Sequence, residues 1–307
     1  MSEKSDKIQN TDFCNTAQNH VFTATDCEGR YITHLRMSIT SRCNLSCSYC
    51  HREGDFSSCE SEEMSLPTIK SIIRSSALIG ITHLKITGGE PLIREDLPET
   101  VAFAKSAGIR DVSLTTNGVL LAEKASQLRK AGLDRLNVGC DSISSSVSPK
   151  NTKAIFPGIT AVREAGFEAT KINMVVLRNI NDSEIEKIIE FARDNKLILQ
   201  LIELVPTEDK EYYSKYHVDL TQTEEYLNSI TRNVRIRSLQ GRKQFEIDNV
   251  VVETVRPFHE EFCRKCTKLR ITSSGMIKPC LMVDTNLVKY SGVSSLLQAI
   301  SYRRIYK

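Results

Sequence analysis

The chain has 307 residues, of which 40% are hydrophobic and 26% charged, with a formal net charge of +3 and a pI near 8.3. This composition is typical of a globular protein, and the length suits one large α/β domain with a small addition. The mildly basic net charge suits an anionic small molecule, and because the basic residues are scattered we expect no nucleic-acid partner. No apolar run reaches membrane-spanning length, and the first ten residues lack the apolar core of a signal peptide. We therefore expect a cytoplasmic protein without a membrane partner.

Residues 1–29 are polar and lack sustained periodicity, which predicts a flexible leader. From Tyr31 onward, short β-type runs alternate with amphipathic helical patterns. The predicted strands are 34–39, 83–87, 111–115, 135–138, 171–176 and 198–204, and the predicted helices are 65–78, 97–107, 121–131, 159–165 and 183–195. Glycine follows four of the helices, as a left-handed C-cap requires, at Gly80, Gly108, Gly132 and Gly166.

Strands that alternate with helices form parallel βαβ units with right-handed crossovers. Six such units make either an open doubly wound sheet or a partial barrel, and in both the sites lie at the C-terminal strand ends. After Leu204 the alternation stops. A helix near 221–230, β-type runs at 234–237, 244–247 and 250–255, and a last helix around 294–305 follow. We predict a leader at 1–29, a core at 30–205 and a C-terminal extension at 206–307.

Ten cysteines in a chain without a secretory signal indicate metal or redox ligands rather than disulfides. The first group is Cys43, Cys47 and Cys50, directly after the first predicted strand. Three core cysteines on one helix face are one interpretation, and a zinc site with His51 as fourth ligand is another. A four-iron cluster with one open iron is the third. Four cysteines are scattered elsewhere: Cys14, Cys27, Cys59 and Cys140.

The second group is Cys263, Cys266 and Cys280, in the sequence FCRKCTKLRITSSGMIKPC. A Cys-x2-Cys pair with a more distant cysteine is a strong metal pattern. A zinc site completed by His259 or a further cysteine is one interpretation. The missing fourth thiolate nearby favours instead a second iron–sulfur cluster with an open iron.

The first cysteine loop, with Tyr49 before its last cysteine, resembles the signature of the radical S-adenosylmethionine (SAM) superfamily. The ITGGEPL segment at 86–92 resembles the GGEP motif of that superfamily, and we expect backbone amides of its two glycines to approach a ligand. The resemblance implies a partial (βα)6 TIM-like barrel, catalytic cluster ligands at the first three cysteines, and SAM on the open iron. It carries the SAM contacts to Tyr49, Gly89, Gly139 and Val205. Relatives have serine where this chain has Gly139, and methionine where it has Val205.

The second cysteine group resembles the C-terminal cluster of the GTP 3′,8-cyclases, which begin molybdenum-cofactor synthesis. The matching residues are Phe262, Cys263, Cys266, Thr267, Lys268, Arg270, Gly275, Cys280 and Leu281. The resemblance runs from Leu35 to Leu281 and is closest to the archaeal type. It implies an α+β C-terminal domain with a second 4Fe-4S cluster that binds guanine. The implied GTP contacts are Arg36, Lys85, Thr115, Lys171, Lys268, Leu269 and Arg270.

The implied enzyme is a radical SAM lyase that converts GTP to (8S)-3′,8-cyclo-7,8-dihydroguanosine 5′-triphosphate. Its implied partners are GTP, an unidentified reductant and, downstream, cyclic pyranopterin monophosphate synthase; a homodimer is one of the states that the resemblance allows. The alternatives are a radical SAM enzyme that modifies a peptide or another small molecule, and a non-catalytic zinc or electron-transfer protein.

One departure from this family concerns the C-terminus. Members typically end in a Gly-Gly tail that enters the active site, whereas this chain ends SYRRIYK. Either Arg303 and Arg304 take over the role of that tail, or the sequence is truncated, or the substrate differs.

Overall fold

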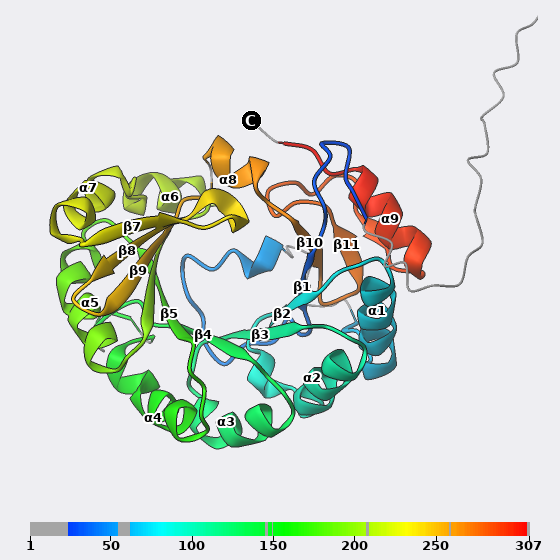
Figure 1. Cartoon of the computed structure of the whole chain (residues 1–307), viewed down its shortest axis with the longest axis horizontal. Helices are drawn as coiled ribbons and strands as arrows, with labels where there is room; N and C mark the ends of the chain where they lie inside the picture. Colours follow the sequence, from blue (N-terminus) through cyan, green and yellow to red (C-terminus); the bar gives the residue numbers. More distant parts are fainter. Residues whose placement is uncertain are drawn as a thin grey trace, which may run out of the picture.

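The computed structural model describes residues 24–54, 62–144, 147–148, 150–206, 209–257 and 259–305. Six parallel strands follow one another around the sheet in sequence order (Figure 1). They are β1 (His34–Ser38), β2 (His83–Thr87), β3 (Asp111–Thr116), β4 (Arg135–Gly139), β5 (Thr170–Val176) and β6 (Ile198–Glu203). A doubly wound sheet would reverse its strand order partway, so that alternative is wrong and the partial barrel is confirmed.

Five helices cover the outer face of the curved sheet (Figure 1). They are α1 (Leu66–Leu78), α2 (Leu97–Ser106), α3 (Leu121–Lys130), α4 (Thr152–Glu164) and α5 (Ile185–Asp194). The α4 helix begins earlier than predicted, because the Asn151 side chain accepts a hydrogen bond from the Ala154 amide (3.0 Å) and caps it. Pro157 lies inside this helix. Because proline usually ends or kinks a helix, the sequence pattern predicts a helix that begins after it. The four glycines after the helices have positive φ, as predicted.

The C-terminal extension adds its strands to both edges of the same sheet. Beyond β6 lie β9 (Val250–Val255), β8 (Lys243–Ile247) and β7 (Asn233–Ile236); beyond β1 lie β10 (Lys268–Ile271), β11 (Met276–Lys278) and β12 (Val288–Lys289). Both β9 and β10 run parallel to their barrel neighbours, and the outer strands are antiparallel. Its helices are α6 (Lys210–Tyr216), α7 (Thr221–Ile230), α8 (Glu260–Arg264) and α9 (Val293–Ser301). The second cysteine group is thereby brought beside β1.

Short 3-10 helices connect several of these elements. They are η1 (Arg52–Gly54), η2 (Pro91–Ile93), η3 (Asp182–Glu184) and η4 (Leu239–Gly241). The η1 helix, light blue in Figure 1, lies in the middle of the ring of strands. The loop that carries the first three cysteines therefore crosses the inside of the barrel.

The segment just before β1 is folded, although the sequence predicts a flexible leader through residue 29. Ala24 is buried and its amide donates to the Ile79 carbonyl (3.2 Å). Gly29 donates to the Asp26 carbonyl (3.0 Å), which closes a turn ahead of β1. The predicted leader is therefore too long at its C-terminal end, and residues 1–23, with Cys14, lie outside the described residues, as does Cys59.

Within the described part of the chain, every helix is too short or too polar to cross a membrane.

Candidate active site between two cysteine trios

Each cysteine group lines a cavity. The first trio, Cys43, Cys47 and Cys50, lines the first cavity. The second trio, Cys263, Cys266 and Cys280, lines the second cavity. Seven residues line both: Arg36, His51, Glu53, Thr115, Asn173, Ile202 and Val205. The two cavities therefore adjoin, and a ligand in one can reach a ligand in the other.

The first trio lies in an irregular loop between β1 and η1. Cys43 and Cys50 are exposed and Cys47 is half-buried, so the interpretation as core cysteines on a helix is wrong. The loop closes a tight turn in which the Cys50 amide donates to the Cys47 carbonyl (3.1 Å). Burial raises the pKa of the Cys47 thiol, and a positively charged metal centre would offset that effect.

The spacing of the sulfur atoms indicates which metal centre fits. Four ligands at about 2.3 Å around one zinc ion place their sulfurs about 3.8 Å apart. Among the described residues, neither trio has all three sulfurs within 4.8 Å of one another. Thiolates that are further apart than a single zinc ion requires fit a cluster of several irons, and three of them leave one iron open. Both trios therefore fit 4Fe-4S clusters better than zinc.

The Gly88–Gly89 pair after β2 packs directly on the first cysteine loop. A Cβ at Gly89 would lie 2.1 Å from the Arg42 carbonyl oxygen, so only glycine allows this approach. The Gly89 amide donates to the Thr40 carbonyl (2.8 Å). The hydrogen of this amide is therefore already bonded, while the predicted contact of Gly89 with SAM stays a prediction. Both glycines still line the first cavity.

Lys150 takes up the space beside Gly139. A Cβ at Gly139 would lie 2.9 Å from Cδ of Lys150. The ammonium of Lys150 lies 3.0 Å from Asp141 Oδ2 and 4.6 Å from the centre of the Tyr49 ring. Tyr49 also donates its hydroxyl hydrogen bond to Asp141. The absence of a serine at position 139 is thus accompanied by a cation that sequence reasoning missed.

These neighbours also determine whether Lys150 and Tyr49, which line the first cavity, are protonated. Burial would lower the pKa of Lys150, but Asp141 and Cys47 outweigh it and raise that pKa. Burial, followed by the Asp141 charge, raises the pKa of Tyr49 well above its ordinary value. The ammonium of Lys150 and the phenol of Tyr49 therefore both stay protonated at neutral pH. All four residues predicted to contact SAM line this cavity: Tyr49, Gly89, Gly139 and Val205.

Strand register brings three cations together in the second cavity. Arg36 on β1 lies beside Lys85 on β2 and beside Arg270 on β10. Lys268, two residues before Arg270, points to the same side of β10 and also lines the cavity. Charges this close repel one another unless an anion lies between them.

One carboxylate already lies among these cations. Glu53 of η1 accepts from Arg36 Nε (2.5 Å), Arg270 Nη1 (3.2 Å) and Thr87 Oγ1 (3.0 Å). Burial would raise the pKa of Glu53, but Arg36, followed by His51 and Arg270, outweighs it and holds that pKa well below its ordinary value. Sequence reasoning missed this residue, although its place three positions after Cys50 was a usable signal.

The two lysines of the second cavity have only neutral partners among the described residues. Lys85 Nζ donates to Asn137 Oδ1 (2.9 Å) and Lys268 Nζ to Gln240 Oε1 (2.8 Å). Burial, followed by the neighbouring arginines, lowers the pKa of both lysines well below its ordinary value. An anionic ligand would reverse this effect and restore their charge.

Two predicted GTP contacts do not line the second cavity. The ammonium of Lys171 lies 2.8 Å from Glu253, a fully buried carboxylate that also pairs with Arg237 and Arg242. Leu269 is fully buried in the core. Arg242, which sequence reasoning missed, does line the cavity. The other predicted contacts line it as well: Arg36, Lys85, Thr115, Lys268 and Arg270.

Two polar atoms at the junction of the cavities are buried without a hydrogen-bond partner. They are Thr115 Oγ1 and His51 Nδ1, and both residues line both cavities. An unsatisfied buried polar atom costs about 1–3 kcal/mol. A polar ligand that spans the junction would remove that cost.

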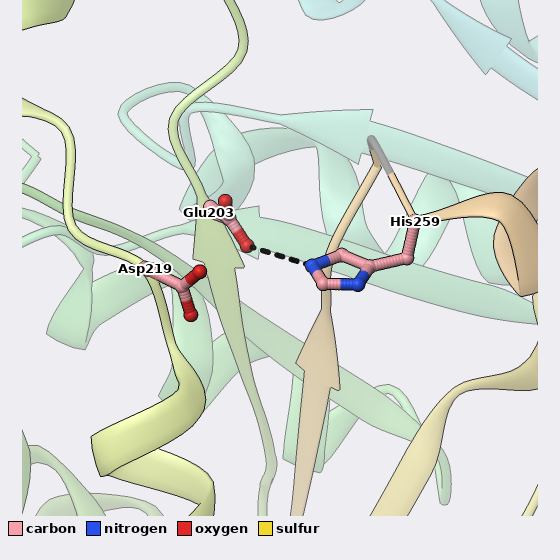
Figure 2. A group of neighbouring side chains, drawn as sticks. All are labelled: Glu203, Asp219 and His259. Carbon is pink, nitrogen blue, oxygen red and sulfur yellow. Dashed lines mark ion pairs between the residues drawn. The ribbon is translucent and has the colours of Figure 1, made fainter. Parts of the chain in front are cut away.

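A third group of potential metal ligands lies at the end of β6. Glu203, Asp219 and His259 approach one another there, with His259 Nε2 3.9 Å from Glu203 (Figure 2). Arg256 already supplies positive charge to this group, 3.3 Å from Glu203 and 2.7 Å from Asp219. We interpret the group as an ion-pair network that holds the segment before α8 against β6.

The scattered cysteines that the structure describes have other surroundings. Cys140 is fully buried, and burial raises its pKa to about 12. Cys27 is exposed and donates to the Arg303 carbonyl (2.7 Å).

The sequence matches two protein families. Residues 37–192 match the radical SAM superfamily, and residues 197–293 match the family described as Molybdenum Cofactor Synthesis C. The chain is 43% identical over 298 residues to a "Probable GTP 3′,8-cyclase" of Methanosarcina acetivorans, covering 91% of this chain and 88% of the relative. It is 40% identical over 272 residues to a protein of the same description from Methanothermobacter thermautotrophicus, covering 86% and 88%.

Solved structures support the fold. Streptococcus suis SuiB superposes with a TM-score of 0.68 at 18% identity, covering 91% of this chain and 68% of SuiB. Native anSMEcpe with bound AdoMet superposes with a TM-score of 0.57 at 16% identity, covering 86% and 80%. The two cysteine trios, their adjoining cavities and the family matches agree, and the chain belongs to the radical SAM superfamily and, within it, to the family of the GTP 3′,8-cyclases.

Proposed function

We propose that this chain is a radical SAM lyase that converts GTP to (8S)-3′,8-cyclo-7,8-dihydroguanosine 5′-triphosphate, the first step of molybdenum-cofactor synthesis. The observation that supports this best is the set of buried cations in the second cavity beside the second cysteine trio. A triphosphate is the kind of ligand that such a set requires, because the cations repel one another and lack sufficient counter-charge. Membership of the cyclase family supports guanosine as the remainder of the ligand.

The residues divide into two sets. Cys43, Cys47 and Cys50 would hold the first 4Fe-4S cluster, with SAM beside Tyr49, Gly89, Gly139 and Val205. Cys263, Cys266 and Cys280 would hold the second cluster, next to the base of GTP. When bound, the first cluster and SAM supply the one-electron chemistry that removes a hydrogen atom from the substrate.

The chain itself orients the substrate. Arg36, Arg270, Lys85 and Lys268 bind the triphosphate from three neighbouring strands, and arginine does so with a two-pronged fork. Thr115 donates its unpaired hydroxyl to the substrate at the junction of the cavities. Such positioning is valuable because a misplacement of about 1 Å can cost about a hundredfold in rate.

The proposal includes further partners. An external reductant supplies the electron, and cyclic pyranopterin monophosphate synthase takes the product. A cytoplasmic location suits both, because oxygen-sensitive clusters and free thiols persist in a reducing compartment. A homodimer is one of the assemblies to test by light scattering.

The experiment is anaerobic reconstitution with iron and sulfide, followed by incubation with SAM, a reductant and GTP. We expect about eight irons per chain, with 5′-deoxyadenosine and the cyclised nucleotide formed together. Cys47→Ser should remove both products and about half of the iron. Cys266→Ser should also lose about half of the iron and all cyclised nucleotide, while still cleaving SAM.

Three outcomes would overturn the proposal. Formation of 5′-deoxyadenosine with peptides but not with GTP would select a peptide-modifying enzyme. Equal turnover of ATP and GTP would exclude recognition of guanine. No SAM cleavage with any substrate would leave a non-catalytic iron or zinc protein.

A further inference from the structure

The guanidinium of Arg303 lies behind the second cysteine trio. Arg303 follows α9 and is only 4% exposed. Its Nη2 donates to the carbonyl of Cys266 (2.9 Å), and its Nη1 donates to the carbonyls of Pro279 (2.5 Å) and Lys268. Cys266 is one ligand of the trio and Pro279 precedes another, Cys280. One side chain thus holds the backbone where it enters β10 and where it leaves β11.

Arg30 holds the remaining ligand segment. Its Nη1 donates to the Cys263 carbonyl (2.7 Å) in α8. Arg30 and Arg303 together therefore bind the backbone at or next to all three cysteines of the second trio.

Asp26 joins the two arginines. Its Oδ2 accepts from Arg30 Nε (2.8 Å) and from Arg303 Nε (3.2 Å), and its side chain is fully buried. Its Oδ1 accepts from the amides of Glu28 and Arg30 (3.0 Å each), which fixes the carboxylate in the turn before β1. Figure 1 shows this dark-blue segment beside the red C-terminal segment after α9. Residues near the two ends of the described chain thus meet on one carboxylate.

We propose that Asp26, Arg30 and Arg303 form a clamp that positions the three ligand segments of the second cluster. The proposal rests on the presence of that cluster, which is part of the proposed function. All three are positioning residues, because they act on the cysteines through backbone carbonyls. Two guanidiniums and one carboxylate leave the clamp with a net positive charge beside the second trio, which partly offsets the negative charge of the thiolates.

The clamp gives Arg303 a role other than binding the substrate. Most hydrogen-bond donors of Arg303 are already bonded to carbonyls and to Asp26, so it has little capacity left for a triphosphate. Arg303 therefore serves the cluster rather than the substrate, and it does not replace a Gly-Gly tail that enters the active site.

The test measures iron at the second trio alone. The parent is the full-length chain with Cys43, Cys47 and Cys50 replaced by serine, which should bind about four irons after anaerobic reconstitution. Arg303→Gln and Asp26→Asn should each retain less than half of that iron. The matched control is Arg232→Gln, since that arginine lines neither cavity and its side chain is 75% exposed and pairs with Asp248 (3.4 Å).

The reduction potential of the second cluster distinguishes an arginine whose charge acts on the cluster from one that only stabilises the fold. The iron that Arg303→Gln retains should have a more negative potential than in the parent, because a nearby positive charge favours the reduced cluster. Arg303→Lys keeps the positive charge, so its reduction potential should stay near that of the parent. It lacks the two-pronged guanidinium, so its iron content should lie between those of the parent and Arg303→Gln. In the wild-type cysteine background, iron at the first trio and SAM cleavage by Arg303→Gln would show that the barrel has folded.

Failure of the clamp can be told from failure of the proposed function. Parental iron content and potential in Arg303→Gln would overturn the clamp and leave the cyclase proposal intact. Equal loss of iron in Arg232→Gln would also overturn it, because the effect would then not depend on the arginine that bonds the ligand segments. If Arg303→Gln loses iron and shifts the potential as expected but the wild-type protein does not turn over GTP, the clamp is supported and the cyclase proposal is contradicted.

Discussion

The two adjoining cavities differ most in charge. The first is lined by three basic residues, Arg36, Arg52 and Lys150, and by three acidic ones, Glu53, Asp141 and Glu203. The second is lined by one acidic residue, Glu53, and by eight basic ones: Arg30, Arg36, Lys85, Arg242, Lys268, Arg270, Arg303 and Arg304. A balanced cavity suits SAM, which carries charges of both signs, and a cationic cavity suits a triphosphate.

The two cysteine trios differ in how they are assembled. The first comes from one loop that spans residues 43–50, so its spacing is visible in the sequence. The second comes from α8, the segment before β10 and the segment after β11, and it is held by arginines near both ends of the described chain. The second site therefore depends on the whole fold to a greater degree than the first.

The largest difference between the two cavities is expected from Arg270→Ala, which should weaken GTP binding but not SAM binding. The change removes a charged donor from the second cavity, and hydrogen bonds to charged groups contribute about 1.5–3 kcal/mol. GTP affinity should fall by about 10- to 150-fold, while SAM affinity stays within about twofold. Calorimetric titration of each ligand into the reconstituted protein measures both.

The control for this change is Arg264→Ala, because Arg264 on α8 has a side chain that is 60% exposed. It should leave both affinities unchanged. A loss of SAM affinity in Arg270→Ala as large as the loss for GTP would show that the cavities do not act separately.

An intermediate effect is expected from Gly139→Ser in the first cavity. The new Cβ would lie 2.9 Å from Lys150 Cδ, so the Lys150 side chain must shift from its place beside Asp141. SAM affinity should fall about tenfold, with little change for GTP. The double variant Gly139→Ser/Lys150→Ala should bind SAM more tightly than Gly139→Ser alone, because the side chain that clashes is gone. Additive losses in the double variant would contradict the assignment of that space to Lys150.

The smallest effect is expected from Glu53→Gln, at the junction of the cavities. Glu53 bonds Arg36 and Arg270, which the triphosphate also needs, so removal of its charge should tighten GTP binding by a few-fold. SAM affinity should not change. Glu95→Gln, at a side chain that is 88% exposed, is the matched control. Weaker GTP binding in Glu53→Gln would mean that the carboxylate orients the arginines rather than competing with the substrate.

Much of the barrel could be predicted from the sequence. The six strands and most of the helix bounds follow from local periodicity and from the glycines that end the helices. The strand order could not be predicted, because neighbouring strands pair through hydrogen bonds between distant residues. Strands β10 and β9 from the C-terminal extension illustrate this, since they pair with opposite edges of the barrel.

The candidate site divides in the same way. The six cysteines could be identified from their spacing, which is a local feature, whereas the cations Arg36 and Arg270 were implied by the resemblance to the cyclase family. The partners of those residues could not be identified. Lys171 has the expected charge and strand, yet its ammonium pairs with Glu253 on another strand.

The sequence alone thus determined which cysteines are the candidate metal ligands and that the chain forms parallel βα units, since both are encoded by residues close together in the chain. Only the tertiary structure decided that Lys150 lies beside Gly139, that Glu53 lies between two arginines, and that Asp26 joins Arg30 to Arg303. Each of these contacts joins side chains that meet only when separate elements pack, and their distances and burial then determine how strongly the charges interact.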